Sequence, residues 1–167
     1  GSEHLVEALD QHYDYIEGTR SPPLEVIVPS ILQMESDKAL PKLIAQMRDP
    51  ATPLEALPLV IGAIVELGGE EAVPALREFL VLYHADSTFQ KKPEPLAAAA
   101  QGIFQHGGPE GRELLQKLMA DSETRPAVAE RIDGLFEREQ KRAEKRAQEQ
   151  ADAAARAAAD AAREERE

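Results

Sequence analysis

The sequence predicts an all-α fold: a short α-α superhelix of helical hairpins, followed by a long C-terminal helix rich in Ala, Glu and Arg. The first observation behind this prediction is the turn Gly68-Gly69, which separates two apolar segments with helical spacing. Glycine adopts the positive φ that ends a helix without a steric penalty, and Pro74 suits the first turn of the next helix. This segment therefore predicts a helical hairpin.

The second observation is that this hairpin pattern recurs along the chain. A shift of 39 residues aligns residues 64–69 with 103–108, including both glycine pairs. A shift of 33 residues in the other direction aligns Val73 and Pro74 with Leu40 and Pro41. One helix pair cannot bury its apolar faces alone, so three hairpins predict an array with one continuous aliphatic interior.

The third observation is a change of composition near the end of the chain. From Glu137 onward only Ala, Glu, Arg, Lys, Gln and Asp occur, without Gly or Pro. The preceding helix is therefore expected to continue through this tail, residues 137–167, for about 45 Å if the tail is fully helical.

The N-terminal part is predicted to cover and begin the array. Gly1 and Ser2 are typical of a cleaved cloning tag, and residues 3–23 are expected to form a covering helix and an irregular linker. Residues 24–33 should form the first helix of the first hairpin, kinked by Pro29 or starting near it. After the capping residues Ser36 and Asp37, the second helix has apolar positions at steps of three and four, namely Leu40, Leu43, Ile44 and Met47.

Two further hairpins are predicted. Residues 54–67 are apolar on nearly every face, which predicts the most buried helix, and residues 71–83 form its amphipathic mate. An insertion at 84–93 separates them from the third hairpin, residues 95–106 and 110–120. A final apolar stripe is expected to seal the array: Val128, Ile132, Leu135 and Phe136.

Composition narrows the classes of partner. The formal net charge of -12 disfavours nucleic acid and anionic membranes, because binding phosphates requires a basic face. The acidity belongs to residues 1–136, which carry 11 basic and 22 acidic residues, whereas the tail carries 8 and 9. The absence of Cys excludes disulfides, thiolate catalysis and cysteine-based metal sites. No apolar run is long enough for direct membrane insertion, and either the cytoplasm or a bacterial periplasm suits the composition.

The four histidines are the candidate metal-binding or acid-base side chains. His12 lies between Asp10 and Asp14, and His84 lies two residues from Asp86, so either could join carboxylates around a divalent ion. Alternate residues do not share a helix face, which favours ordinary surface histidines. No P-loop, dinucleotide fingerprint, HExxH or nucleophile elbow occurs. We therefore predict no enzyme, no cofactor and no catalytic residue, and keep a metal-binding enzyme or sensor as the alternative.

The tail has two interpretations. The favoured one is a mostly solvated single helix, stabilised by helix propensity and by pairs such as Glu137 with Lys141. In the alternative, the tail associates weakly with a partner helix or with itself through small residues that bury little area. These residues form an alanine seam at steps of three and four: Ala143, Ala147, Ala151, Ala154, Ala158 and Ala161.

Residues 49–80 resemble a HEAT-like repeat, in which a helix ending in Glu-Leu-Gly-Gly is followed by Glu-Glu-Ala-Val-Pro-Ala-Leu at the start of its antiparallel mate. The resemblance extends over residues 24–136 and implies a right-handed α-solenoid whose second helices line a concave face that holds other proteins. Some HEAT-like proteins are enzymes, including iron-dependent deoxyhypusine hydroxylases, which bind metal through His-Glu dipeptides, and certain bilin lyases. This sequence contains no His-Glu dipeptide. The tail is similar in composition to the stalks of TolA-like envelope proteins.

We therefore expect a non-enzymatic scaffold or adaptor that binds another protein, with the tail as a spacer or tether. The candidate partner-binding residues on the second helices are Lys42, Glu78 and Lys117. His84 and Phe89, in the insertion, form the other candidate surface.

Overall fold

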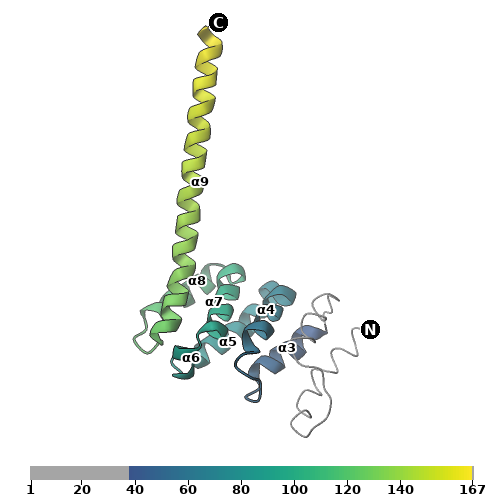
Figure 1. The fold of residues 1–167 in the computed structure, drawn as a ribbon. Coiled ribbons are helices and arrows are strands. Elements are labelled where there is room, and N and C mark those ends of the chain that lie inside the picture. Colours follow the sequence, from purple (N-terminus) through teal and green to yellow (C-terminus); the bar gives the residue numbers. More distant parts are fainter. Residues whose placement is uncertain (1–37, 167) are drawn as a thin grey trace. The chain divides into compact units, whose positions relative to one another are not determined.

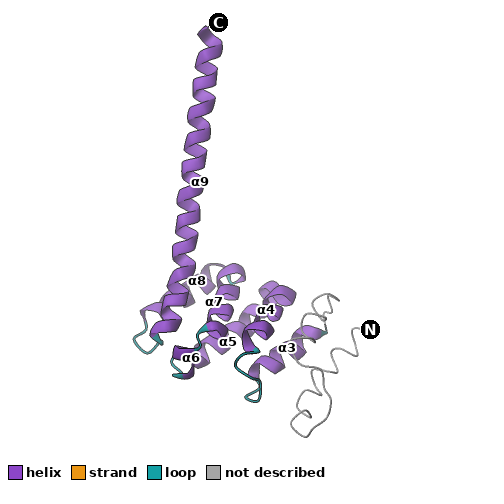
Figure 2. Ribbon diagram, viewed as in Figure 1, coloured by secondary structure: helices purple, strands orange, loops and turns teal. Residues whose placement is uncertain are grey.

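The computed structural model describes residues 38–166 (Figure 1). Within this range the chain consists of helices joined by loops, without a strand (Figure 2). The all-α prediction is confirmed for these residues. The expected N-terminal helix and linker, the helix at 24–33, the capping residues Ser36 and Asp37, and His12 lie outside the described residues.

The chain divides into two compact units, Gly1–Ile132 and Asp133–Glu167. The described elements of the first unit are α3 (Ala39–Arg48), α4 (Leu57–Gly68), the 3-10 helix η2 (Gly69–Ala72), α5 (Val73–Tyr83), α6 (Thr88–Lys91), α7 (Glu94–His106) and α8 (Gly108–Ala120). α9 (Pro126–Arg166) begins in the first unit and supplies every described residue of the second. The tail therefore continues the preceding helix without a break, as predicted.

The core of the first unit is aliphatic and is shared by successive helices. α3 packs against α4, while α7 packs against α4, α5 and α8, which makes α7 the central helix among those described. The largest side chains without solvent exposure lie on α3, α4, α5, α7 and α8: Leu43, Ile61, Ile64, Leu76, Leu80, Leu96, Ile103 and Leu115. Of the predicted sealing stripe on α9, Val128 and Ile132 are fully buried and Leu135 is buried, whereas Phe136 is half-buried.

Gly102 lets α7 approach two helices at once. A Cβ atom at this position would lie 2.6 Å from Val65 Cγ2 on α4 and 2.7 Å from Leu76 Cδ1 on α5. Such distances are too short for carbon atoms, so glycine is required for this packing. Ala99 and Ala100, on the same helix, are likewise fully buried.

Each glycine pair meets two different requirements. The second glycine of each pair, Gly69 or Gly108, has a positive φ of 52° or 62°, a backbone region that glycine enters without a Cβ penalty. The first glycine is needed for space: a Cβ on Gly68 would lie 2.8 Å from Ala72 Cβ, and one on Gly107 would lie 2.5 Å from the Ile103 carbonyl oxygen. The second glycine of both pairs thus has a positive φ, but the turns differ, because the 3-10 helix η2 separates α4 from α5 whereas α8 begins directly at Gly108.

Two helices begin later than the sequence pattern suggests, because of proline. The helix expected from Leu54 begins at Leu57, where Pro58 falls in the first turn. A start at Leu54 would place Pro58 in the helix interior, where it cannot donate a backbone hydrogen bond. Pro74 acts in the same way: η2 precedes α5, which begins at Val73.

Replacing Gly102 tests the close approach of α7. We expect Gly102→Ala to lower the free energy of unfolding by about 1–3 kcal/mol, because the added methyl group would overpack the contact with Val65 and Leu76. Gly62→Ala, in the interior of α4, is the matched control because no atom lies within 4 Å of its added Cβ. This control should raise the free energy of unfolding by up to about 1 kcal/mol, because alanine favours a helix interior more than glycine does. Urea unfolding followed by circular dichroism measures the free energy of unfolding of both variants. Equal stability of the two variants would contradict the packing described.

Candidate functional site

The predicted partner-binding residues Lys42, Glu78 and Lys117 lie on α3, α5 and α8 respectively. Lys42 is half-buried, whereas the other two are exposed. Arg48 at the end of α3 donates a hydrogen bond of 2.9 Å to the Glu78 carboxylate, and Lys117 pairs with Glu113 at 3.2 Å. Exposed ion pairs contribute little to stability, so a partner's charges can replace these at small cost.

Two apolar residues that the sequence interpretation did not single out are exposed on α5. Val81 has an exposed fraction of 47% and Leu82 of 68%, the large hydrophobic side chains on the surface of the described chain. They follow Glu78 by three and four residues and therefore lie on its side of the helix. The sequence contains a signal for them, since both lie outside the buried stripe that runs through Leu76 and Leu80.

We refer to Arg77, Glu78, Val81 and Leu82 as the α5 outer face; all four are exposed. This face combines a small apolar centre with charged neighbours of both signs. Protein interfaces commonly have this composition, with apolar side chains at the centre and a polar rim. The α5 outer face can therefore accept an apolar side chain of another protein and pair with adjacent charges.

Phe89, in the insertion, is placed in the interior. Its exposed fraction is 4%, and its ring contacts those of Phe79 and Tyr83 with centroid separations of 6.4 Å and 5.7 Å. Edge-to-face packing of this kind stabilises the end of α5. The ring therefore has little surface left for a partner, and we do not include Phe89 in the proposed binding surface.

His84 connects the insertion, residues 84–93, to the segment before α9 through hydrogen bonds. Its Nδ1 lies 2.9 Å from the hydroxyl of Thr124, which is buried, and its carbonyl oxygen accepts a hydrogen bond of 2.9 Å from the Arg125 amide. The Arg125 side chain donates a second bond to the Ala85 carbonyl at 2.7 Å. These contacts give His84 a structural role.

Two carboxylates accept hydrogen bonds in the insertion and in the loop before α4. Asp86 accepts a hydrogen bond of 2.9 Å from the Thr88 amide, and this bond lowers the pKa of Asp86. Glu55 accepts a bond of 2.6 Å from the Lys92 ammonium, which lowers the pKa of Glu55. Both carboxylates are therefore charged at neutral pH, and each fixes a position in a loop.

An open hollow of about 370 Å³ lies where the turn between α4 and α5 meets the turn between α7 and α8. Its lining is Glu70, Val73, Pro74, Arg77, His106, Gly107, Glu110 and Gly111. Acidic and basic groups occur together, and every lining residue except Gly111 is at least partly exposed. Arg77 also belongs to the α5 outer face, so the hollow adjoins this surface.

Between residues 38 and 166, no three His, Asp or Glu side chains are grouped as a metal ion would require. None of the helices in that same range has both the length and the apolar character needed to cross a bilayer.

Comparison of the chain with known protein families, with curated proteins and with solved structures found no match. Any function therefore has to follow from the residues and the geometry described above.

The contact between His84 and Thr124 can be tested with a double-mutant cycle. We expect Thr124→Val to lower the free energy of unfolding by about 1 kcal/mol, because it keeps the side-chain shape but removes the hydroxyl group. In a His84→Phe background the same change should cost little, since the partner is already absent. Denaturant unfolding of the parent, the two single variants and the double variant gives the coupling energy. A value near zero would show that this hydrogen bond does not stabilise the attachment of the insertion.

Proposed function

We propose that this protein is a non-enzymatic interaction scaffold or adaptor of the HEAT-like, α-solenoid type. In this proposal the helical hairpins bind another protein through their second helices, and the tail is a spacer or tether.

The observation that carries the proposal is the exposure of Val81 and Leu82 on α5. Fully burying a leucine side chain in an interface stabilises it by about 1.5–3 kcal/mol, which is enough for one residue to dominate a modest contact. Val81 and Leu82 lie side by side outside the buried stripe, so a partner that covers both would bury one small continuous apolar area. Glu78 beside them supplies a charge for orientation.

The two glycine pairs support a repeat architecture. Gly69 and Gly108 have the same positive-φ conformation 39 residues apart, and Leu76 and Leu115 are both fully buried at the corresponding positions. In a HEAT-like array the second helices would be α3, α5 and α8, which carry the predicted partner-binding residues. The tail suits a spacer because all residues from 140 to 166 are exposed.

A charge-insertion variant tests the α5 outer face. We expect Val81→Glu combined with Leu82→Glu to weaken partner binding at least about tenfold, because two carboxylates would have to be buried in an apolar contact. Gln101→Glu combined with Gln105→Glu is the matched control: it adds the same charge at two exposed positions of α7. Both variants should remain within about 0.5 kcal/mol of the parent in unfolding free energy, since all four side chains are exposed.

The measurement is affinity capture with quantitative mass spectrometry, followed by titration of each captured protein against the three purified forms. A partner lost with the α5 variant and kept with the control supports the proposal. If every captured protein binds all three forms equally, the α5 outer face is not the binding surface. Charge reversal at Lys42, Glu78 and Lys117 then tests whether the contact extends over the second helices.

A further inference from the structure

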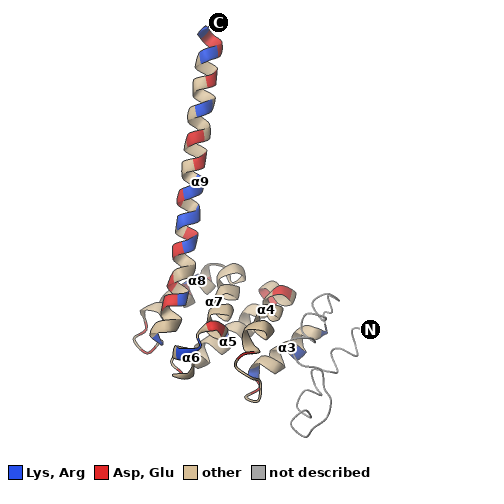
Figure 3. Ribbon diagram, in the orientation of Figure 1, with Lys and Arg blue, Asp and Glu red and all other residues tan. Residues whose placement is uncertain are grey.

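The first turns of the tail carry a group of basic side chains. Five of the nine residues from 138 to 146 are basic, and all five are exposed: Arg138, Lys141, Arg142, Lys145 and Arg146. They succeed one another at steps of three, one, three and one residues. Figure 3 shows Lys and Arg concentrated in this part of α9, with Asp and Glu more frequent further along. We refer to these five residues as the basic row.

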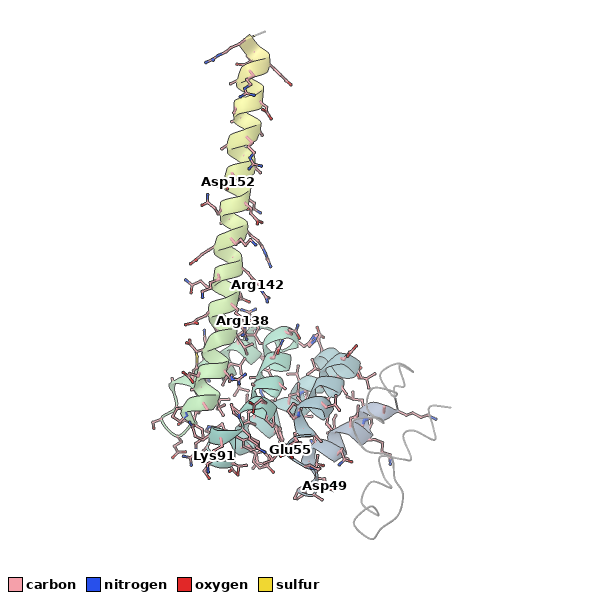
Figure 4. The ribbon with its side chains drawn as sticks, in the orientation of Figure 1. Asp49, Glu55, Lys91, Arg138, Arg142 and Asp152 are labelled. Atoms are coloured by element: carbon pink, nitrogen blue, oxygen red, sulfur yellow. The ribbon has the colours of Figure 1, made fainter. Side chains whose placement is uncertain are left out.

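The steps place the basic row on one side of the helix. A helix turns by about 100° per residue, so the five positions fall between about -60° and +80° of Arg138, an arc of about 140°. The two acidic residues of the same segment, Glu139 and Glu144, lie at about 100° and -120°, outside this arc. Figure 4 labels Arg138 and Arg142, which are four residues apart on α9. One side of the helix is therefore basic over about 12 Å, the rise of eight residues.

The basic row is not neutralised by ion pairs within the described chain. Between residues 38 and 166, no carboxylate oxygen lies within 4.0 Å of any of its five charged groups. Arg138 and Arg142 are four residues apart, as are Arg142 and Arg146, and like charges at this spacing repel each other and destabilise a helix. A surface of opposite charge against this side would offset the repulsion, so the row is complementary to an acidic partner.

We propose that the basic row binds an acidic helix of another protein, one that carries its carboxylates along one side over a similar length. Three of the five residues of the row are arginines, whose planar guanidinium groups donate paired hydrogen bonds to a carboxylate. Exposed ion pairs contribute little one by one, so the contact requires several pairs to form together as a network. This inference goes beyond the proposed scaffold function, in which the tail is a spacer or tether, and does not depend on a partner at the α5 outer face.

The surroundings of the row favour an acidic helix over a membrane or a nucleic acid. An amphipathic helix binds a membrane through apolar side chains next to its basic ones. The apolar residues between 137 and 150 are Ala143 and Ala147, which lie on the opposite side of the helix, at about 140° and 180°. A nucleic acid continues its phosphates beyond the row, where Glu149 follows on the same side, at about 20°. A short acidic helix can end where the row ends.

Fluorescence anisotropy of labelled peptides titrated with the full chain tests the proposal. The first peptide is a helix of Ala and Gln with five Glu on one side, at the same steps of three, one, three and one residues. The second peptide has the same composition, with the five Glu spread around the helix, and circular dichroism confirms that both are helical. At about 50 mM salt, where screening is modest, we expect the one-sided peptide to bind at least about fivefold more tightly.

Two variants of the chain assign the contact to the basic row. Arg142→Glu with Lys145→Glu should lower the affinity for the one-sided peptide at least about tenfold, because two attractive contacts become repulsive. Arg156→Glu with Arg163→Glu is the matched control: it makes the same change of charge at two exposed positions on the same side of the helix, beyond the row. The control should keep its affinity within about twofold of the parent. Circular dichroism of both variants checks that the helix remains intact.

Several results would overturn the proposal. Equal affinity for the two peptides would show that the one-sided pattern is not recognised, and equal losses in the two variants would place the contact outside the row. Tighter binding of a DNA duplex of about 20 base pairs, or of vesicles about one third phosphatidylserine, than of the one-sided peptide would assign the row to a different partner. Self-association of the chain in sedimentation, lost in the row variant but kept in the control, would assign it to a second copy.

Discussion

The first unit depends on the close approach of α7 to both α4 and α5. Gly102 provides the space for Val65 and Leu76, and neighbouring small residues keep the rest of the contact close. Because the chain has few aromatic residues and no tryptophan, its core is built from aliphatic side chains that require short distances between helices. A larger residue at position 102 would press on side chains of two helices at once, Val65 of α4 and Leu76 of α5.

Much of this architecture follows from local sequence, because glycine ends a helix and proline limits where one can begin. The glycine pairs and the apolar periodicity predict the helices α4, α5, α7 and α8, and the composition predicts the unbroken α9. The errors have local causes as well. Pro58 delays α4 because a proline in the helix interior lacks its hydrogen bond, an effect that apolar spacing does not reveal.

The candidate site was less predictable, because exposure is decided by tertiary contacts. Phe89 lies in a polar insertion and was expected at the surface, but its ring packs against those of Phe79 and Tyr83 on α5. Val81 and Leu82 show the opposite: they belong to an apolar segment, yet no helix between residues 38 and 166 buries them. A residue that departs from the helical stripe is thus more informative about binding than one in a loop.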